Sequence, residues 1–398
     1  MSKIRVAVIF GGRSGEHEVS LSSAQSVMAA LDPAKYEVVP IGITRRGTWI
    51  AGEGTLQALM TEDFSTTRQA AIFADPSKQG VWSAPALPPE SGGADTAHGL
   101  AAASRAERLE ALSRVDVVFP VLHGTFGEDG TVQGLLELSG VPYVGGGVLC
   151  SALAMDKIAF KDVVKTHGIP VADYVWTSRR LWLVDREAVL DQVERQLGYP
   201  VFTKPANLGS SVGISKCHNR NELRDGLDEA VRYDRRVMAE WAVPAAREIE
   251  VSVLGNEEPS ASVPGEVIPS REFYDYAAKY LDEGEQASKL IIPAQLDPAT
   301  QGLIQELAVR SFRAIDGAGM ARVDFLLSRE TGDVYLNEIN TIPGFTPISM
   351  YPKLWEASGV PYARLLDWLI DLALERHREN QRSERVFYPR GQGGPGLV

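Results

Sequence analysis

The sequence predicts an α/β protein of two or three domains, the first of which is built on a parallel β-sheet. The chain has 398 residues, which is too long for one small hydrophobic core. Apolar runs typical of buried strands alternate with amphipathic stretches typical of helices, and this order favours a parallel sheet. Hydrophobic residues make up 44% of the chain and charged residues 23%, a balance typical of globular proteins.

Residues 1–150 are predicted to form the first, Rossmann-like domain. The run at 4–10 is apolar throughout, as in a strand buried on both faces. A helix is predicted to begin near Ser20, a residue type that favours helix N-termini. Three more strands are expected at 37–43, 116–121 and 142–144. The stretch 83–105 is rich in Pro, Gly, Ser and Ala, which predicts a surface insertion.

The second predicted domain covers residues 151–240, and helices and strands alternate in it again. Its strands are expected at 174–177, 200–204, 214–217 and 236–240, and its helices at 185–197 and 222–233.

The third predicted domain covers residues 241–377 and opens with a hairpin that turns at Gly255 and Asn256. An irregular stretch at 269–293 follows, and then a helix that Gly317 is expected to end. Two strands, a loop and a closing helix at 362–377 complete the domain. Residues 378–398 are charged and rich in Gly and Pro, which predicts a disordered tail.

Charge, cysteine content and hydropathy exclude several classes of function. The formal net charge is −12, which disfavours a nucleic-acid partner because phosphate backbones require clustered Lys and Arg. With two cysteines, neither a disulfide framework nor a four-cysteine zinc site can form. We find no run of 18 apolar residues and no signal-peptide pattern, so we expect a cytoplasmic protein that does not enter the membrane.

Two predicted strands between residues 321 and 340 carry a candidate metal site. Side chains alternate faces along a strand, so Arg322 shares a face with Asp324. On the next strand Glu338 shares a face with Asn340, and in an antiparallel pair the two faces can coincide. Mg²⁺ prefers such oxygen ligands, and the guanidinium would stabilise negative charge on a transferring phosphoryl group.

A half-exposed hairpin with ordinary surface charges is the alternative interpretation of these strands. Against it, the second strand runs directly into residues 341–347, which contain two prolines and a glycine. A loop of such restricted backbone does not suit a plain solvent-facing turn.

A second group of residues has the character of a nucleotide site. Lys204 ends a predicted strand and precedes a Gly- and Ser-rich loop at 207–213, where backbone N–H groups can approach phosphate closely. The spacing is not that of a P-loop, and a polar turn is the alternative. Lys157 opens a helix and is a candidate second phosphate ligand, although alone it would be an ordinary surface lysine. Glu240 ends a strand where it could face an adenine edge, and Glu248 could then reach the ribose.

Two further polar residues follow predicted strands of the first domain. His123 lies at the edge where open α/β sheets bind ligands, although a hydrogen-bonded structural histidine is the commoner case. Glu16 precedes a helix in a Gly-rich loop, where a carboxylate could simply favour the helix dipole. Neither residue decides a function by itself.

Taken together, these stretches resemble the D-alanine–D-alanine ligases of the ATP-grasp superfamily. The resemblance covers residues 3–375 and implies three α/β domains, with ATP clamped between the second and the third. The matching stretches are FGGRSGEHEVSLSSA (10–24), FPVLHGTFGEDGTVQGLLELSGVPYVG (119–145), SALAMDK (151–157), KPANLGSSVG (204–213), REIEVSVLGN (247–256), FYDYAAKYL (273–281), ARVDF (321–325) and NEINTIPGFTPISMYPKLW (337–355).

The resemblance implies roles for the candidate residues. Those expected at ATP are Lys157, Lys204, Ser210, Ser211, Glu240, Trp241, Val243, Glu248, Asn337 and Glu338. Those expected to hold two Mg²⁺ ions, for which Mn²⁺ could substitute, are Asp324, Glu338 and Asn340. Those expected at the first D-alanine are Glu16 and His123, with Ser210 and Tyr280 hydrogen-bonded to Glu16. Those expected at the oxyanion are Arg322 and the backbone of Gly344. Those expected at the second D-alanine or the transferring phosphate are Lys279, Ser349 and Met350.

The implied activity is ATP-dependent ligation of two D-alanines through a D-alanyl phosphate, for the synthesis of peptidoglycan precursors. A homodimer is expected, and residues 269–293 are the expected lid over the site. Tyr280 resembles the dipeptide-forming members, which favours D-alanine over D-lactate or D-serine as acceptor. The alternative from another class is a non-catalytic ATP-binding sensor, which the complete set of charges around Asp324 disfavours. The connection 241–246 is longer than is usual in the family, so the backbone groups that face adenine stay open.

Overall fold

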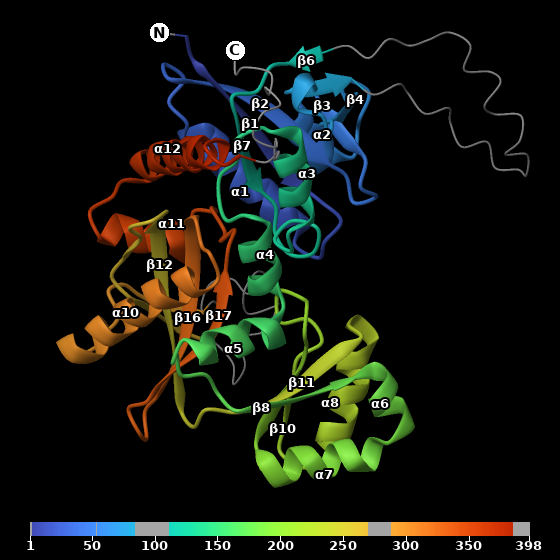
Figure 1. Ribbon diagram of the computed structural model, residues 1–398, viewed down its shortest axis with the longest axis vertical. Helices are drawn as coiled ribbons and strands as arrows, with labels where there is room; N and C mark the ends of the chain where they lie inside the picture. Colours follow the sequence, from blue (N-terminus) through green and yellow to red (C-terminus); the bar gives the residue numbers. More distant parts are fainter. Residues whose placement is uncertain (1, 53, 84–110, 270–287, 385–398) are drawn as a thin grey trace, which may run out of the picture.

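The structure is a computed structural model that describes residues 2–52, 54–83, 111–269 and 288–384. It contains three β-sheets, which fall within residues 4–121, 174–241 and 246–340 (Figure 1). Helices cover these sheets, so the predicted α/β class is confirmed. None of the described helices is long and apolar enough to cross a lipid bilayer.

The first sheet has the strand order β6-β5-β4-β3-β2-β1-β7. The predicted apolar runs form its parallel part, which is β1 (Ile4–Gly11), β2 (Tyr36–Ile43) and β7 (Val117–Val121). The strand predicted at 142–144 is wrong, because that segment forms only an isolated bridge to β7. Four short antiparallel strands extend the sheet and were not predicted: β3 (Trp49–Ala51), β4 (Arg68–Ala71), β5 (Val81–Ser83) and β6 (Ala111–Ser113). Apart from residue 83, the predicted insertion lies outside the described residues.

Helix α1 (His17–Ala30) begins three residues before the predicted start at Ser20. The Ser20 hydroxyl does not cap the helix. Instead it accepts a hydrogen bond from the Gly11 amide at 2.8 Å and donates one to the Val121 carbonyl oxygen. A buried serine that ties a helix to two strands has the same sequence signature as a cap. The other helices beside this sheet are α2 (Thr55–Thr61), the short 3₁₀ helix η1 (Pro76–Lys78) and α3 (Thr131–Ser139).

The second sheet is antiparallel, with the strand order β10-β9-β11-β8. Its strands begin and end within two residues of the prediction: β8 (Tyr174–Ser178), β9 (Val201–Pro205), β10 (Ser215–Cys217) and β11 (Arg236–Trp241). The helices that pack on it are α6 (Arg179–Val184), α7 (Arg186–Gln196) and α8 (Arg220–Tyr233). Two helices connect it to the first sheet, α4 (Val148–Met155) and α5 (Lys157–Thr166) (Figure 1).

The third sheet has the order β15-β14-β12-β16-β17, with β13 paired to β12. The predicted hairpin is present as β12 (Ala246–Gly255), β13 (Ser260–Ala261) and β14 (Gly265–Ile268). The predicted two strands at its centre are β16 (Gly319–Ser328) and β17 (Val334–Asn340). Two elements correct the prediction, β15 (Lys289–Ile291) in the stretch expected to be irregular and α11 (Met350–Ala357) in the stretch expected to be a loop. Both short elements gain their order from packing on this sheet rather than from their own propensity.

Helix α10 (Pro298–Ala314) ends differently from the prediction. The residue with left-handed backbone is Asp316, with φ +59°, and not Gly317. Gly317 serves a close approach instead: its N–H donates to the Phe312 carbonyl oxygen at 2.9 Å, and a Cβ at this position would lie 2.6 Å from Phe312.

Helix α12 (Tyr362–Gln381) packs against the first sheet, although it follows the third sheet in sequence (Figure 1). Its Leu365 and Leu369 belong to one buried cluster with Val8 and Phe10 of β1. The helix ends at Gln381 rather than at residue 377, so the first four residues of the predicted tail are helical.

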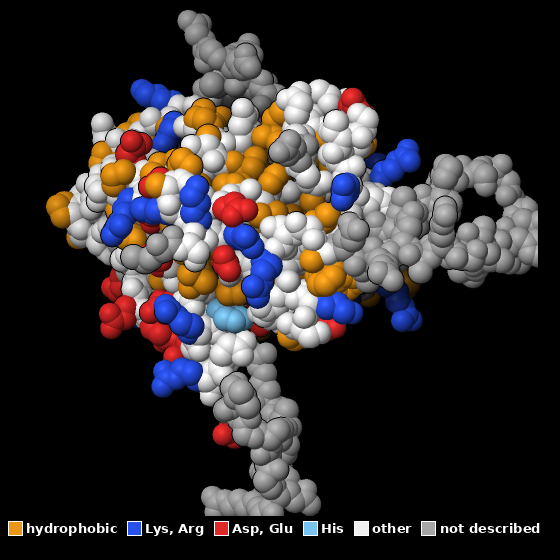
Figure 2. Space-filling model, turned by 90° about the horizontal axis from the view of Figure 1, so that it is seen from above, with side chains coloured by type: hydrophobic (Ala, Val, Ile, Leu, Met, Phe, Trp, Pro, Cys, Tyr) orange, Lys and Arg blue, Asp and Glu red, His pale blue; other side chains and the backbone are white. Residues whose placement is uncertain are grey.

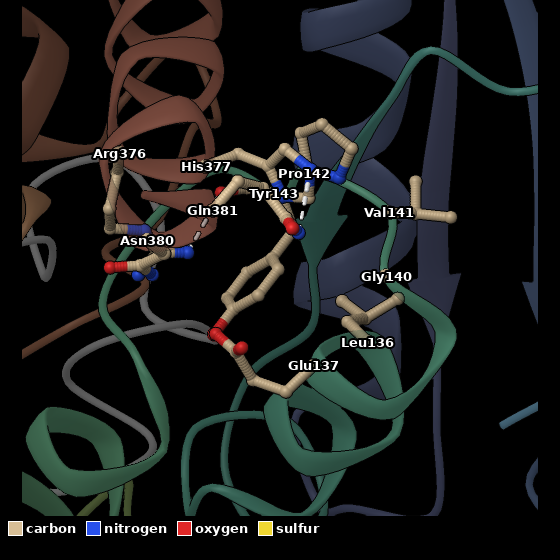
Figure 3. Close-up of a pocket in the computed structure, with 10 residues that line it drawn as sticks. All are labelled: Leu136, Glu137, Gly140, Val141, Pro142, Tyr143, Arg376, His377, Asn380 and Gln381. Atoms are coloured by element: carbon tan, nitrogen blue, oxygen red, sulfur yellow. Dashed lines mark hydrogen bonds between the residues drawn. The ribbon is translucent and has the colours of Figure 1, made fainter. Parts of the chain in front are cut away.

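The docking of α12 is visible in Figure 3. The Arg376 guanidinium lies 4.2 Å from the ring centroid of Tyr143 and donates to the carbonyl oxygen of that residue at 3.2 Å. The Tyr143 hydroxyl in turn donates to Glu137 at 2.7 Å. The cavity between these side chains is about 10 Å³, room for about one water molecule, so this junction is structural. On the face seen in Figure 2, acidic and basic side chains are interspersed rather than separated by sign.

Candidate active site

A cleft of about 1260 Å³ is lined by strands of the second and third sheets, by helix α1 and by the loops that follow β1 and β7 of the first sheet. All predicted site residues that the structure describes line this cleft. They are Glu16, His123, Lys157, Lys204, Ser210, Ser211, Glu240, Trp241, Val243, Glu248, Arg322, Asp324, Asn337, Glu338, Asn340, Gly344, Ser349 and Met350. Lys279 and Tyr280 lie outside the described residues, as does most of the expected lid.

Strand register explains why the charged cluster forms. In the antiparallel pair β16–β17, Arg322 is opposite Asn340 and Asp324 is opposite Glu338. On the other side of β16, Glu250 of β12 is opposite Asp324. Residues directly opposite in antiparallel strands point to the same face, so all five side chains project toward one wall of the cleft.

A β-bulge in β17 adds a residue to this wall. The register shifts after Asp324, so that Phe325 is opposite Leu336 and Asn337 is left as the extra residue. Bulges turn a side chain away from strict alternation, and Asn337 accepts a hydrogen bond from Lys204 Nζ at 3.5 Å. Alternation alone would have placed Asn337 on the opposite face from Glu338.

Arg322 is held between two carboxylates. Its Nε and Nη2 donate to the two Asp324 oxygens at 2.8 and 2.7 Å, and Nε lies 2.9 Å from Glu250 Oε2. Burial alone would lower the pKa of Arg322, but Asp324 and Glu250 outweigh it and hold the pKa well above its usual value. A permanently cationic guanidinium therefore stands on this wall of the cleft.

The donor set on this wall suits a hard divalent cation. Asp324, Glu338 and Asn340 offer two carboxylates and an amide, which are ligands that Mg²⁺ accepts. Asn340 Nδ2 also donates to Asp324 Oδ2 at 3.1 Å, so the amide and the carboxylate are already in contact. Within the described ranges no cluster of three or more His, Cys, Asp or Glu could enclose a metal. Proteins usually bind Mg²⁺ through one or two carboxylates, and a phosphate-bearing substrate and water supply the other ligands.

The Gly/Ser loop has an unusual backbone at its centre. Ser210 and Ser211 adopt left-handed conformations, with φ of +52° and +58°, which side-chain-bearing residues rarely adopt. Such strain is concentrated at ligand sites. The loop is tied to the start of α5, because Lys157 Nζ donates to the Leu208 carbonyl oxygen at 2.7 Å and its amide donates to Ala206 O at 2.8 Å.

Lys204 and Glu240 were assigned separately to phosphate and adenine, but the structure joins them. Lys204 Nζ lies 2.5 Å from Glu240 Oε2, and a third residue, Lys161 of α5, lies 2.5 Å from Oε1. Burial alone would raise the pKa of Glu240, but the charges of Lys161 and Lys204 outweigh burial and hold it below its usual value. The carboxylate is therefore ionised, and burial at the same time lowers the pKa of Lys161 from its usual value.

The predicted hydrogen bond between Glu16 and Ser210 is present, with the serine hydroxyl as donor. The Glu16 carboxylate sits between two glycines. A Cβ on Gly124 would lie 2.6 Å, and one on Gly209 3.0 Å, from Glu16 Oε2. Glycine at both positions allows two loops from different domains to close around one carboxylate.

His123 is more constrained than the sequence suggested. Its Nδ1 donates to the Ile342 carbonyl oxygen at 3.0 Å, its Nε2 lies 3.2 Å from Ser23 Oγ, and Glu128 approaches Nδ1 at 4.0 Å. Burial would lower the pKa of His123, but Glu128 and Glu16 raise it above its usual value. His123 thus links the end of β7 to the loop that carries Gly344.

The Gly344 loop is closely packed against the start of α11. The Thr346 amide donates to Ser349 Oγ at 3.0 Å, and the two hydroxyls lie 2.7 Å apart. A Cβ on Gly344 would lie 2.7 Å from Ser349 Oγ, so a larger residue here would displace either the Ser349 side chain or the loop.

Sequence reasoning missed three charged residues that shape the site, Glu128, Lys161 and Glu250. Two of them carried a signal. Lys161 is four residues after Lys157 and so lies on the same helix face, and Glu250 is two residues after Glu248 and so lies on the same strand face. No spacing rule identifies Glu128, whose place depends on how the loop after β7 folds back, with the Gly124 amide donating to its carboxylate at 3.1 Å.

Comparisons with known proteins identify similar chains and a matching family. Residues 5–146 match the family model described as D-ala D-ala ligase N-terminus, and residues 163–371 match D-ala D-ala ligase C-terminus. The chain is 50% identical over 388 residues to the D-alanine–D-alanine ligase of Natranaerobius thermophilus. The aligned region covers 97% of this chain and 99% of that one. It is also 50% identical to the ligase of Heliobacterium modesticaldum, over 98% of this chain and 100% of that one.

Solved structures give the same result. The D-alanine–D-alanine ligase from Coxiella burnetii superposes with a TM-score of 0.76 at 36% identity, covering 96% of this chain and 97% of that one. The VanG D-Ala:D-Ser ligase from Enterococcus faecalis superposes with a TM-score of 0.78 at 35% identity, covering 94% of this chain and 100% of that one.

Proposed function

We infer that this chain, which belongs to the D-alanine–D-alanine ligase family, joins two D-alanines into D-alanyl-D-alanine at the expense of ATP. ADP and phosphate are the other products, and the dipeptide serves peptidoglycan synthesis, the role of the family. The observation that carries this proposal is that one cleft is lined both by Arg322, Asp324 and Glu338 and by the hydrogen-bonded pair of Glu16 and Ser210. One side suits phosphoryl chemistry and the other an amino acid. Cytoplasmic location and a homodimer are part of the proposal and rest on the family.

ATP is proposed to lie along the wall formed by β11, β12 and the Gly/Ser loop. Glu240 and the backbone at Trp241–Val243 face adenine, and Glu248 faces the ribose. Lys157, Lys204, Ser211 and the loop amides face the phosphates, where fixed cations and N–H dipoles neutralise charge without reorganisation. Lys204 must exchange its contact with Glu240 for one with phosphate.

Asp324, Glu338 and Asn340 are the residues proposed to hold magnesium. When bound, the metal supplies charge neutralisation and alignment of the phosphate oxygens. Arg322 remains cationic beside these ligands, so it can stabilise the charge that develops when the carboxylate of the first D-alanine accepts the γ-phosphoryl group.

The first D-alanine is proposed to place its ammonium on Glu16, which Ser210 holds in orientation. Its activated carbonyl then meets the amine of the second D-alanine near Ser349 and Met350. The oxyanion of that step is stabilised by Arg322 and the backbone N–H of Gly344. His123 keeps the Gly344 loop in position through Ile342.

The test of this proposal is substrate-dependent phosphate release. With ATP and Mg²⁺, we expect phosphate to appear only when D-alanine is added, and mass spectrometry to identify the dipeptide. Formation of ADP that is indifferent to D-alanine would contradict a ligase, and nucleotide binding with no turnover at all would favour the sensor.

The acceptor is tested in the same assay with D-serine and D-lactate as second substrates. D-serine is the alternative acceptor to compare with D-alanine, because the VanG D-Ala:D-Ser ligase superposes on 94% of this chain. We expect D-alanine to give the highest kcat/KM, and a higher value for D-serine would reassign the product.

Gly344→Ala is expected to lower kcat by on the order of ten- to a hundredfold while D-alanine is still bound. The added methyl group would lie 2.7 Å from Ser349 Oγ, so either the loop moves or the Ser349 side chain gives up its hydrogen bond from the Thr346 amide. Steady-state kinetics measure the loss. The matched control is Gly302→Ala in α10, where nothing lies within 4 Å of the added Cβ, and wild-type kinetics are expected. Equal activity of the two variants would remove the Gly344 backbone from the oxyanion site.

A further inference from the structure

A buried lysine lies behind the nucleotide site and outside the lining of the cleft. Lys161 is 1% exposed, on the face of α5 that also carries Lys157. Its Nζ is 2.5 Å from Glu240 Oε1 and donates to the Leu336 carbonyl oxygen of β17 at 3.5 Å. A buried ammonium group is costly unless a charge and hydrogen-bond acceptors compensate it, and here both come from the two sheets on either side of the nucleotide site.

The two oxygens of Glu240 are divided between two lysines of different accessibility. Oε1 faces Lys161, which does not reach the cleft. Oε2 faces Lys204, which lines the cleft and also contacts Asn337. Lys204 is the only one of these two ammonium groups that a bound nucleotide can attract. When Lys204 turns to the phosphates, Glu240 Oε2 is released and Lys161 remains as the counter-charge.

We propose that Lys161 is a positioning residue that keeps the Glu240 carboxylate charged and aimed, and thereby sets the preference for a 6-aminopurine nucleotide. The proposal rests on the placement of adenine at Glu240. A carboxylate only accepts hydrogen bonds, so the amino group at C6 of adenine can donate to Oε2. The 6-oxo group of hypoxanthine presents lone pairs to the same atom and is repelled. A site whose buried polar group would be left unpaired discriminates strongly between two such ligands.

Loss of Lys161 has a second consequence for the phosphates. The negative charge of Glu240 would then be balanced by Lys204 alone and no longer by both lysines. Lys204 would be retained at the carboxylate, and both the purine preference and the binding of the triphosphate would suffer. A lysine that only filled space in the core would affect ATP and ITP equally.

The experiment is Lys161→Met in the full chain, with ATP and ITP compared at saturating D-alanine and Mg²⁺. We expect the ratio of kcat/KM for ATP over ITP to fall by about tenfold or more, and KM for ATP to rise more than kcat falls. Calorimetric binding of ADP and IDP provides the same ratio without any ligase reaction. An unchanged ratio in folded protein, or an equal loss for both nucleotides, overturns the proposal.

Three variants separate this role from a structural one. Lys165→Met, one turn further along α5 at a solvent-exposed lysine over the Tyr174 ring, is expected to keep the wild-type ratio. Lys161→Arg retains the charge and is expected to recover part of the discrimination.

The double variant Lys161→Met with Glu240→Gln leaves no uncompensated carboxylate, so it is expected to fold even where the single variant does not. It should bind ADP and IDP with similar affinity, and an intact preference for ADP would also overturn the proposal. Failure of the wild-type protein to form the dipeptide would contradict the proposed function instead, and the ADP and IDP measurements would still decide the role of Lys161.

Discussion

Glu338→Gln is expected to lower kcat by on the order of a thousandfold, because a metal-held phosphoryl group gains several kcal/mol of transition-state stabilisation. Glu338 is opposite Asp324 on adjacent strands, so the two carboxylates face one point in the cleft. The amide has nearly the same shape but no charge. We therefore expect the fold to survive and the affinity for Mg²⁺ or Mn²⁺ to fall. Steady-state kinetics measure the loss in kcat. A titration with Mn²⁺, monitored by electron paramagnetic resonance, measures the loss of metal affinity.

The matched control for this variant is Glu330→Gln. Glu330 lies in the exposed turn between the same two strands, where its backbone amide donates to the Ser328 hydroxyl oxygen at 3.3 Å. Wild-type kcat and metal affinity are expected there. Near-wild-type rates for Glu338→Gln would remove it from the metal shell, and melting temperatures of both variants show whether any loss arises from unfolding.

The parts of the fold that could be predicted from sequence are those in which local pattern and tertiary environment agree. The apolar run of β1 and the alternating runs of β16 and β17 are long enough for burial to select one register. The short strands β3 to β6 and β15 are three or four residues each, and they are strands only because a neighbour supplies hydrogen bonds. No pattern within such a segment distinguishes it from a loop.

The candidate site shows the same division. Alternation placed Arg322 beside Asp324, and the register confirms that pair. The bulge that adds Asn337 to the wall and the buried contact of Lys161 with Glu240 arise from the meeting of separate sheets. Contacts between elements far apart in the chain give only a weak sequence signal. Here that signal is the four-residue spacing of Lys157 and Lys161 on α5.

Arg322→Lys is the second variant with a large expected effect, a loss in kcat of on the order of a hundred- to a thousandfold, or about 3–4 kcal/mol in the barrier. Arg322 reaches both Asp324 oxygens through Nε and Nη2 and lies against Glu250 at the same time. A lysine keeps one positive charge between the two carboxylates but cannot form the planar two-point contact. The fold should therefore hold while the charge is no longer aimed at the reacting oxygen.

The kinetic pattern distinguishes this role from ground-state binding. If Arg322 acts on the transition state, kcat and kcat/KM fall together and KM for ATP changes little. A rise in KM with unchanged kcat would mean that Arg322 only binds substrate, and would contradict its role at the oxyanion. The control is Arg329→Lys, an exposed arginine 3.7 Å from Glu266 just beyond the end of β16, where the same replacement should leave both constants unchanged. Because the two arginines differ in their place along the hairpin and not in the chemistry of the substitution, the comparison isolates the position of the guanidinium relative to the cleft.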